Sequence, residues 1–299
     1  MCGKSQMNIF TGLEQIVEAD HPLSNHTWYG LGGKADYFIR PRTVEELREV
    51  VVRLFENEMP VHVIGFGSNL LISDKGVRGA VLKLEGEEFK RTEFDGDRVT
   101  AGAGAEMSKL VLTCVKKGLS GIEALTGIPG SVGGSVRMNA GGRFGDLGSA
   151  VERVTLMDNA GNLFEKAKPE LVFDYRRTNI TARFIVSTRL DMSPADPDQI
   201  MRTVKEIWIY KKNTQPLNTR NSGCVFKNPR GVSAGALIDR AGLKGLQIGQ
   251  AVVSEKHANF IVAGKGCSSE DVLKLIAAVR ERVKQEFDVD LELEIEVWE

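Results

Sequence analysis

Glycine is distributed very unevenly along this 299-residue chain, and that distribution limits the folds the chain can adopt. Ten of its 32 glycines fall between Gly118 and Gly148, whereas none occurs from Asn162 to Ser222. Ile, Val, Pro and Met separate the clustered glycines, which excludes a flexible Gly/Ser linker. Because no period of roughly 20–50 residues relates them, a repeat architecture is also excluded. We therefore interpret the cluster as backbone that turns tightly or approaches a ligand closely.

Charge and cysteine content exclude several functional classes. The chain has 39 basic and 40 acidic side chains and a pI near 6.5, whereas nucleic-acid-binding domains usually have a pI above about 9. No apolar run approaches the roughly 18 residues of a membrane helix, and the N-terminal segment MCGKSQMNIF lacks the apolar core of a secretory signal. We therefore expect no nucleic-acid partner, no membrane insertion and a cytoplasmic location. The cysteines form no C-x-x-C pair, which predicts reduced thiols and no metal site; they are Cys2, Cys114, Cys224 and Cys267.

The pattern of apolar, turn and capping residues predicts helices and strands without strict β-α-β alternation, which favours an α+β fold. The pairs Thr43 with Glu46 and Ser268 with Asp271 predict capping boxes at two helix starts. The segment SPADPDQ (193–199) is typical of a linker and predicts a domain boundary near residue 196. Helices are expected over 43–58, 105–118, 197–212, 233–242 and 268–287, and strands over 61–65, 79–84, 98–104, 151–165 (a hairpin), 182–192, 224–228 and 289–299.

The first glycine loop, VIGFGSNLLISDKGVRG (63–79), places residues 65–69 directly after an expected strand. Successive backbone N–H groups in such a turn can form a nest for a phosphate, and Ser68 and Asn69 add side-chain donors. The loop is not a dinucleotide-binding fingerprint, because an extended apolar run follows it instead of a helix. It is not a Walker loop, because no G-K-[ST] follows. The alternative is a tight β-turn that binds no ligand.

The second glycine loop is GIEALTGIPGSVGGSVRMNAGG (121–142). Pro129 restricts the backbone before Gly130, and Gly133 and Gly134 remove side chains where we expect the chain to enter a strand. Small residues beside Thr126, Ser131 and Asn139 would then form a flat surface rich in hydrogen-bond donors. Such a surface suits a large planar cofactor with a pyrophosphate, and a purely structural loop is the alternative.

Two charged segments suit an anionic ligand. Arg176 and Arg177 lie in FDYRRTN (173–179), and the planar guanidinium matches a carboxylate or a phosphate. An arginine pair exposed to solvent is the alternative. A second group lies within YKKNTQPLNTRNSGCVFKNP (210–229), where the alternative is a solvated basic face. Its members are Lys211, Lys212, Arg220, Lys227 and Asn228.

The remaining reactive residue types have ordinary structural interpretations. Cys224 lies in an apolar context typical of a buried structural thiol. The tail LELEIEVWE has three glutamates at period two, which predicts one face of a strand and, by default, a solvated face. The glutamates are Glu292, Glu294 and Glu296, and the four dispersed histidines, which we interpret as structural, are His21, His26, His62 and His257.

Taken together, these segments resemble the UDP-N-acetylenolpyruvoylglucosamine reductase (MurB) family along nearly the whole chain. Each block is moderately specific, and their order is very specific. The matching segments are HPLSNHTWYGLGGKADYFIRP (21–41), VIGFGSNLLISDKGVRG, GIEALTGIPGSVGGSVRMNAGG, FDYRRTN, NSGCVFKNP, AGALIDRAGLKGLQIGQAVVSEKHANFIV (234–262) and LELEIEV.

The resemblance implies a two-lobed FAD-binding region of the vanillyl-alcohol-oxidase or PCMH type over residues 1–196, with its core at 30–196. A C-terminal α+β substrate-binding domain would occupy residues 197–299. The implied reaction passes a hydride from NADPH to FAD and then to the enolpyruvyl group of UDP-N-acetylglucosamine enolpyruvate. The product, UDP-N-acetylmuramate, enters peptidoglycan synthesis. No tyrosine-bearing insertion separates FDYRRTN from NSGCVFKNP, which indicates the compact second type of the family.

The same resemblance implies roles for individual residues. The catalytic residues would be Arg176, Cys224 and Glu294. The substrate-binding residues would be Tyr175, Lys212, Lys227 and Asn228. The cofactor-binding residues would be Gly65, Phe66, Gly67, Ser68, Asn69, Thr126, Gly127, Pro129, Gly130, Ser131, Gly133, Gly134 and Asn139.

One position departs from the family pattern, since Cys224 stands where the family usually has the proton-donating serine. A thiol with a pKa near 8.5 is mostly protonated at pH 7 and is more acidic than a serine hydroxyl. Our hypothesis is therefore that Cys224 donates the proton. Arg176 would supply the fixed positive charge that an enolate-like state needs, and a protonated Glu294 could donate a hydrogen bond to the same oxygens.

Two other functions remain open at this stage. A different FAD-dependent oxidoreductase, acting on a sugar or alcohol, could use the same scaffold, because fold does not determine function. It would share the glycine loops but has no reason to share GCVFKNP, FDYRRTN and the tail glutamate together. A non-catalytic nucleotide sensor is the second alternative, and the replacement of serine by Cys224 is the feature that favours it.

Overall fold

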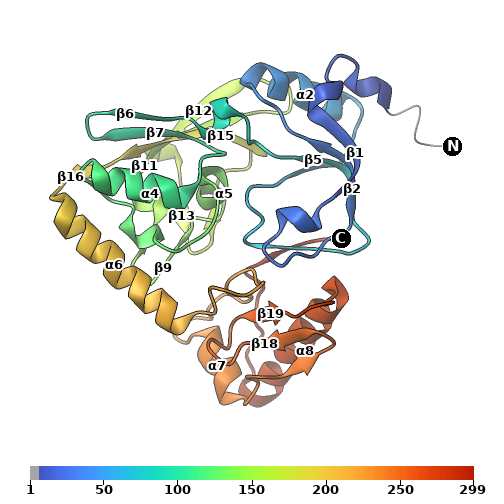
Figure 1. The fold of residues 1–299 in the computed structure, drawn as a ribbon, viewed down its shortest axis with the longest axis vertical. Helices are drawn as coiled ribbons and strands as arrows, with labels where there is room; N and C mark the ends of the chain where they lie inside the picture. The colour runs from blue at the N-terminus through green and yellow to red at the C-terminus, as the bar shows by residue number, and fades with distance from the viewer. Residues whose placement is uncertain (1–6) are drawn as a thin grey trace. The chain divides into compact units, whose positions relative to one another are not determined.

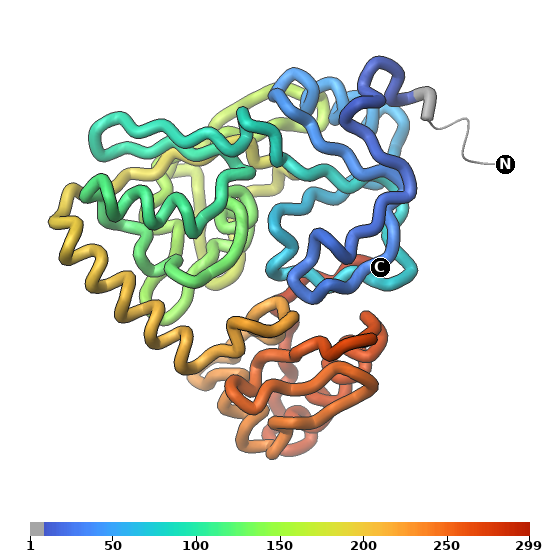
Figure 2. The backbone as a smooth tube through the Cα atoms, in the orientation of Figure 1, coloured from blue at the N-terminus to red at the C-terminus, as the bar shows by residue number. Residues whose placement is uncertain are grey.

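The computed structural model describes residues 7–299, and their contacts divide the chain into two compact units (Figure 1, Figure 2). Among the described residues, unit 1 contains 7–21, Asp36–Gly65 and Arg78–Ile209. Unit 2 contains Pro22–Ala35, Phe66–Val77 and Tyr210–Glu299. The contact boundary therefore falls after Ile209, and two N-terminal segments belong with the C-terminal unit. The functional division at residue 196 stays a prediction.

Unit 1 begins with a four-stranded sheet of order β1-β2-β5-β3, in which β3 and β5 are parallel. Its helix α2 (Val44–Glu56) buries one face, formed by Leu47, Val50, Val51 and Leu54. Thr43 caps the helix by accepting from the Glu46 N–H, but the Glu46 carboxylate bonds Arg42, so only half of the predicted capping box forms. The strands are β1 (Val17–Pro22), β2 (Lys34–Ile39), β3 (Val61–Val63) and β5 (Val77–Leu82), and the 3-10 turns nearby are η1 (Met7–Phe10), η2 (Glu14–Ile16) and η3 (Ser24–His26).

A second, five-stranded sheet of order β12-β11-β15-β7-β6 completes the core of unit 1, and all four strand pairs are antiparallel. Helices α4 and α5 lie on one face of this sheet (Figure 1). The predicted hairpin is confirmed as β11 with β12. The elements are α3 (Glu87–Lys90), β6 (Thr92–Asp95), β7 (Arg98–Gly102), α4 (Met107–Lys116), η4 (Glu123–Leu125), α5 (Val132–Arg137), β9 (Gly141–Gly142), β10 (Gly145–Asp146), η5 (Leu147–Ser149), β11 (Val151–Met157), β12 (Leu163–Ala167), η6 (Lys168–Glu170), β13 (Phe173–Asp174), β14 (Arg177–Thr178) and β15 (Phe184–Asp191).

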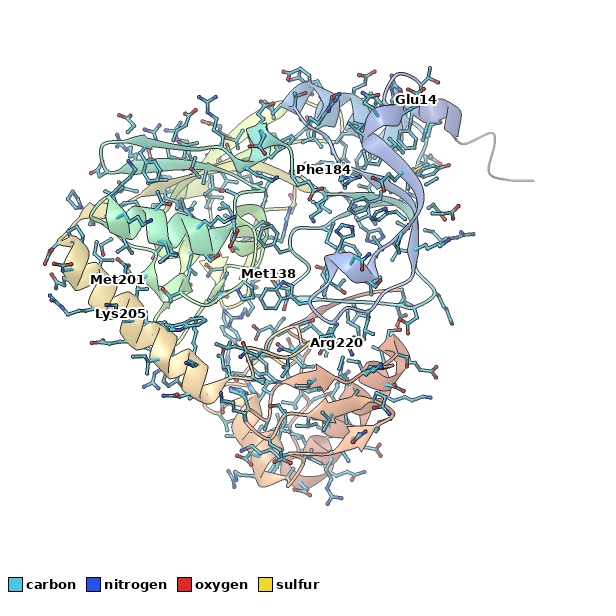
Figure 3. All side chains as sticks on the ribbon, in the orientation of Figure 1. Glu14, Met138, Phe184, Met201, Lys205 and Arg220 are labelled. Atoms are coloured by element: carbon cyan, nitrogen blue, oxygen red, sulfur yellow. The ribbon has the colours of Figure 1, made fainter. Side chains whose placement is uncertain are left out.

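The predicted linker 193–199 is wrong as a free connection. Its first residues form β16 (Ser193–Pro194), which pairs antiparallel with β8 (Leu119–Ser120). Helix α6 (Pro197–Thr214) then begins within the same segment. Met201 and Lys205 lie one turn apart on α6 (Figure 3), and Met201 packs against the core of unit 1 while Lys205 is exposed. Composition did not predict this pairing, because a segment rich in proline and polar residues is typical of a linker. Proline is nevertheless tolerated at the end of an edge strand, where Pro194 lies.

Unit 2 has its own hydrophobic core, in which α8 packs against β17 and β18. The capping box at Ser268 is confirmed, since Ser268 and Asp271 satisfy each other's backbone N–H groups. A short parallel pair, β4 with β20, joins the first glycine loop to the C-terminal end. The elements are β4 (Leu70–Ile72), α7 (Ala234–Arg240), β17 (Gln247–Ile248), β18 (Ala251–Val253), β19 (Ile261–Ala263), α8 (Ser269–Phe287) and β20 (Glu296–Trp298).

The two strands predicted over 224–228 and 289–299 form only in part. A single bridge joins Phe226 to Leu293, and the regular C-terminal strand is limited to β20. The Glu294 and Ile295 N–H groups both approach the Val225 carbonyl, at 2.8 and 3.5 Å. Two residues opposite one partner are typical of a bulge, which interrupts the ladder. No helix among residues 7–299 is long and apolar enough to cross a membrane.

Candidate functional site

The first glycine loop follows β3 and leads into β4. Gly67 has a φ of +61°, and a Cβ at this position would overlap the carbonyl oxygen of His26. A Cβ on Gly65 would lie 2.5 Å from Ser131 Oγ. The chain's own packing therefore requires glycine at position 67, whatever ligand the loop binds, whereas a side chain at position 65 would displace the Ser131 hydroxyl.

The same loop also has several backbone N–H groups that are available to a ligand. In the described part of the chain, the backbone N–H groups of Gly65, Phe66, Gly67 and Asn69 donate to no acceptor. A row of unused N–H groups at a glycine turn forms the kind of nest that binds a phosphate. The donor set therefore fits the pyrophosphate of a dinucleotide cofactor.

The second glycine loop leads into a helix, so the prediction of a strand after Gly133–Gly134 is wrong. Ser131 is the N-cap of α5, and its Oγ accepts from the Gly134 N–H at 3.2 Å. A Cβ on Gly133 would lie 2.8 Å from the Cβ of Ala103. Across residues 7–299, no acceptor takes the N–H groups of Gly127 and Gly130. Like the first loop, this one offers unused backbone donors on a surface with little side-chain bulk.

Arg176 lies in a tight turn of unit 1. Tyr175 and Arg176 form the two-residue connection between β13 and β14, and Arg176 has a φ of +56°. Its guanidinium lies over the ring of Tyr175, 5.1 Å from the centroid. Arg177 does not share this setting, because it bonds the Asp174 carboxylate and holds the pKa of that group below its usual range. The two arginines predicted as a pair are thus separated.

Cys224 and Glu294, both in unit 2, are brought together by the C-terminal segment. The Glu294 N–H donates to the Val225 carbonyl at 2.8 Å, directly after Cys224. On its other side Asn69 Nδ2 donates to the Glu294 carbonyl at 3.1 Å. The first glycine loop, the thiol segment and the tail glutamate therefore adjoin one another. Arg176 belongs to unit 1.

The tail glutamates do not share one environment. Glu292 and Glu296 are exposed, whereas Glu294 is half-buried. Glu292 also forms an ion pair with Lys227 at 3.4 Å. The shift of register at Val225 separates Glu294 from the other two, which the period-two pattern did not predict.

The basic cluster also divides into different environments. Lys211 is only 7% exposed, on the face of α6 that carries Ile207, so it is not part of a solvated basic face. Lys212 is exposed, and its carbonyl oxygen accepts from Lys256 Nζ. Asn228 Oδ1 accepts from the Ala234 N–H at 3.0 Å, which places it at the start of α7.

The sequence pattern missed Asn259, a buried residue of unit 2. Its backbone carbonyl accepts from Val225, and its carboxamide bonds both backbone groups of Phe226, at 2.9 and 2.8 Å. It therefore holds the segment after Cys224 from the side opposite the tail. The signal was a single polar residue before the apolar run FIV (260–262).

The other thiols are structural. Cys114 and Cys267 are buried, and burial raises their pKa to about 12 and about 11. Neither forms a disulfide within the described residues. Cys2 lies outside that range. Burial also lowers the pKa of His257, whose Nδ1 accepts from the Asn259 N–H at 3.2 Å.

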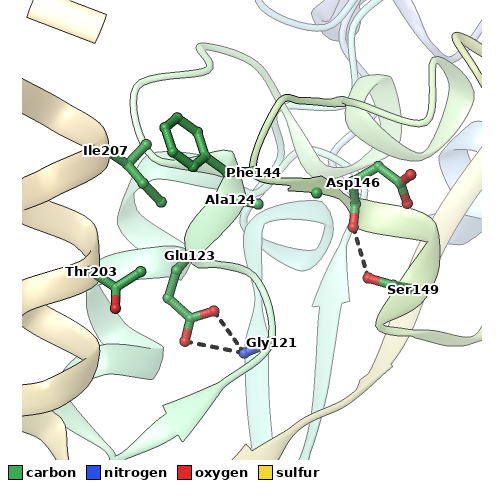
Figure 4. Close-up of a pocket in the computed structure, with 9 residues that line it drawn as sticks. Gly121, Glu123, Ala124, Phe144, Asp146, Ser149, Thr203 and Ile207 are labelled. Atoms are coloured by element: carbon green, nitrogen blue, oxygen red, sulfur yellow. Dashed lines mark hydrogen bonds between the residues drawn. The ribbon is translucent and has the colours of Figure 1, made fainter. Parts of the chain in front are cut away.

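A separate pocket of about 200 Å³ opens in unit 1 between α6, η4 and β10 (Figure 4). The Glu123 carboxylate there turns back onto the Gly121 N–H, and Ser149 Oγ donates to the Asp146 carbonyl. No basic side chain lines it, which makes it unsuitable for an anionic nucleotide. Its lining contains none of the predicted site residues: it consists of Gly121, Glu123, Ala124, Phe144, Gly145, Asp146, Ser149, Thr203 and Ile207.

Two family models match the chain. "FAD binding domain" matches residues 35–166, and "UDP-N-acetylenolpyruvoylglucosamine reductase, C-terminal domain" matches residues 215–298. The UDP-N-acetylenolpyruvoylglucosamine reductase of Moorella thermoacetica is 41% identical over 289 residues, covering 96% of this chain and 95% of that protein. The crystal structure of the enzyme from Thermus caldophilus superposes with a TM-score of 0.81 at 38% identity, covering 95% of this chain and 98% of that one.

The fold extends beyond these relatives. Phl p 4.0202, a glucose dehydrogenase, gives a TM-score of 0.52 at 13% identity, covering 96% of this chain and 63% of that one, a likeness of fold alone. Together with the matched domains, it confirms the predicted α+β class, an FAD-binding region followed by a C-terminal domain. The chain therefore belongs to the UDP-N-acetylenolpyruvoylglucosamine reductase (MurB) family of FAD-dependent oxidoreductases that act in peptidoglycan synthesis.

Proposed function

We propose that this chain catalyses the NADPH-dependent reduction of UDP-N-acetylglucosamine enolpyruvate to UDP-N-acetylmuramate, with Cys224 as the proton donor. The observation that carries the proposal is the junction of Cys224 with Glu294 through the Val225 peptide in unit 2. A proton donor and a carboxyl group then come from two chain segments that a backbone hydrogen bond joins. When bound, FAD would supply the chemistry of hydride transfer, and the family uses NADPH as its reductant.

The roles of the three residues follow from the chemistry of the enolpyruvyl group. Hydride addition to its CH₂ carbon sends negative charge into the attached carboxylate, so fixed positive charge there lowers the barrier. Arg176 supplies that charge, and a protonated Glu294 donates a hydrogen bond to the same oxygens. The Cys224 thiol then gives its proton to the carbon next to the carboxylate. A positioned general acid is typically worth about 10²–10⁴ in rate.

We propose that the two glycine loops bind FAD, because both offer backbone N–H groups that no acceptor among residues 7–299 takes. The proposed cofactor residues are Gly65–Asn69, Thr126, Gly127, Pro129–Ser131, Gly133, Gly134 and Asn139. In Gly65, Gly67 and Gly133 the absence of a side chain also satisfies internal packing. The proposed substrate residues are Tyr175, Lys212, Lys227 and Asn228, whose charges and polar groups suit a nucleotide diphosphate. We place the enzyme in the cytoplasm, where thiols such as Cys224 remain reduced.

Anaerobic absorbance spectroscopy of the purified FAD-loaded protein tests the proposal. NADPH should bleach the flavin absorbance, and the colour should return only when the enolpyruvyl nucleotide is added. Bleaching of the oxidised flavin by a sugar or alcohol, with no recovery on adding the enolpyruvyl nucleotide, would identify another oxidoreductase on this scaffold. Failure of NADPH to bleach the flavin, with tight binding of the nucleotide, would identify a sensor.

A further inference from the structure

The turn that presents Arg176 adopts a backbone conformation that its own residues disfavour. Arg176 has a φ of +56°, in the left-handed region that non-glycine residues rarely adopt. Such a residue keeps this conformation only when its surroundings determine it. The contacts that hold the turn therefore decide where the Arg176 guanidinium lies.

Asp174 is the first of these contacts. One carboxylate oxygen accepts from the Tyr175 N–H at 2.7 Å, and the other accepts from Arg177 Nε at 2.9 Å. These bonds close the turn around Arg176 from both sides. The carbonyl oxygen of Asp174 points elsewhere, and it accepts from Asn139 Nδ2 at 3.1 Å.

Asn139 lies one residue beyond the C-cap of α5, Met138, and is 2% exposed. Its Oδ1 accepts from the Gly148 N–H at 2.9 Å, while its Nδ2 bonds Asp174. A carboxamide provides an acceptor and a donor on one short side chain, whereas a carboxylate lacks the donor. A Cβ on Gly148 would overlap the Phe173 side chain, so Gly148 lets the same hairpin pack closely. Asn139 thus connects α5, η5 and the Arg176 turn.

Helix α5 also holds the segment that follows the hairpin. Arg137, in its last turn, donates to the carbonyl oxygens of Ile180, Ala182 and Arg183. Met138, labelled in Figure 3, separates Arg137 from Asn139. The N-cap of α5 is Ser131, in the second glycine loop. One six-residue helix of unit 1 therefore begins at the proposed cofactor loop and ends on the hairpin that carries Arg176.

We infer that Asn139 is a positioning residue for Arg176, fixing the arginine turn relative to the second glycine loop through the Asp174 carbonyl. The inference rests on the proposed function, in which Arg176 acts on the enolpyruvyl carboxylate. Beyond any change in FAD binding, Asn139 then acts on the step that uses Arg176, which is reoxidation of the flavin by the nucleotide. Reduction of the flavin by NADPH does not use Arg176.

Three variants distinguish the loss of the hydrogen bonds of Asn139 from a change in backbone conformation. Asn139 has a φ of +42°, so Asn139→Gly keeps the backbone conformation and removes the carboxamide. Asn139→Asp retains an acceptor for Gly148 but cannot donate to Asp174. Glu58→Gly is the matched control, since it makes the same type of change at a φ of +51° on an exposed residue after α2.

Stopped-flow absorbance of the FAD-saturated proteins should show flavin reduction by NADPH at the wild-type rate in Glu58→Gly, and any slowing of that step in the two Asn139 variants should be smaller than the slowing of reoxidation. Reoxidation by the enolpyruvyl nucleotide should slow by about 10- to 100-fold in Asn139→Gly and Asn139→Asp and stay unchanged in Glu58→Gly, as expected when a reacting group is misplaced by about 1 Å. Adding Asn139→Gly to Arg176→Ala should slow reoxidation no further. Unchanged reoxidation in Asn139→Gly, equal slowing of both half-reactions, or additive effects would overturn the inference.

Hydrogen exchange provides a readout that does not depend on activity. Amides in 172–178 should exchange at least tenfold faster in Asn139→Gly than in wild type, with the exchange of α2 unchanged. If wild-type flavin is not reoxidised by the nucleotide, the proposed function fails. In that case equal exchange in wild type and Asn139→Gly overturns the positioning role, and faster exchange shows that Asn139 holds the turn for some other reaction.

Discussion

Beside the segment that follows Cys224, the carboxamide of Asn259 makes the two hydrogen bonds that a neighbouring strand would make to Phe226. Its Oδ1 accepts from the Phe226 N–H at 2.9 Å, and its Nδ2 donates to the Phe226 carbonyl at 2.8 Å. Phe226 is 1% exposed and Asn259 is 2% exposed, so water does not replace these bonds easily. Asn259→Ala leaves two buried backbone groups without partners, at about 1–3 kcal/mol each. We expect a loss of about 3 kcal/mol in the local stability of unit 2. This value lies in the lower half of the range for two such groups, because water can enter the volume that the side chain leaves.

Hydrogen exchange of the Phe226 amide measures this loss where it occurs. A loss of about 3 kcal/mol corresponds to roughly 100-fold faster exchange, at about 1.4 kcal/mol for each factor of ten. Asn57→Ala is the control, because Asn57 is exposed and donates one bond to the Arg53 carbonyl at 2.8 Å. It should cost less than about 1 kcal/mol and leave the Phe226 amide unchanged. Acceleration of less than tenfold in Asn259→Ala would refute the assignment of Asn259 as the clamp on this segment.

Three further predictions concern Gly67, Cys224 and His257. Gly67→Ala should lower the midpoint of thermal unfolding by several degrees more than Gly96→Ala. Both positions have a φ of +61°, which costs about 1–2 kcal/mol for alanine, but only Gly67 would also clash with backbone; equal shifts would contradict this. Iodoacetamide should inactivate the wild-type enzyme but not an active Cys224→Ser variant, because the two other described thiols are buried with raised pKa values; inactivation of the serine variant would contradict the role of Cys224. Burial lowers the pKa of His257, so the unfolded chain takes up the proton first. The free energy of unfolding should therefore fall as the pH drops from 7 through the usual histidine range to the folded pKa, and urea titrations of His257→Gln should show a flatter dependence. A wild-type slope equal to that of the variant would remove His257 as the cause.

Local chemistry determined which elements could be predicted from the sequence. The β11–β12 hairpin was predictable because Asp158 accepts from the backbone of Ala160 and Asn162, within one turn. The start of α8 was predictable because Ser268 and Asp271 cap each other. In contrast, the C-terminal tail pairs with residues around 70 and 225, and such distant partners leave no local signal.

The candidate site shows the same division between local and distant causes. The glycine loops and the segments with Arg176 and Cys224 could be identified as motifs. The reason for individual glycines could not, since Gly67 is required by the backbone of His26, about 40 residues away in the chain. The bonds of Asn259 to Phe226 and of Asn139 to Asp174 could not be predicted, because the partners lie 33 and 35 residues away. The structural role of a buried polar side chain depends on the groups to which it is hydrogen-bonded, and these are not evident from the neighbouring sequence.

The measurement that tests the proposed reaction most directly is anaerobic stopped-flow absorbance of Cys224→Ala, with Cys224→Ser as the matched control. NADPH should reduce the bound FAD at the wild-type rate in both variants, because the thiol takes no part in that step. Reoxidation by the enolpyruvyl nucleotide should slow by about 10²–10⁴ in Cys224→Ala, and the serine variant should recover much of the rate. Reoxidation of Cys224→Ala at the wild-type rate would show that another group protonates the substrate.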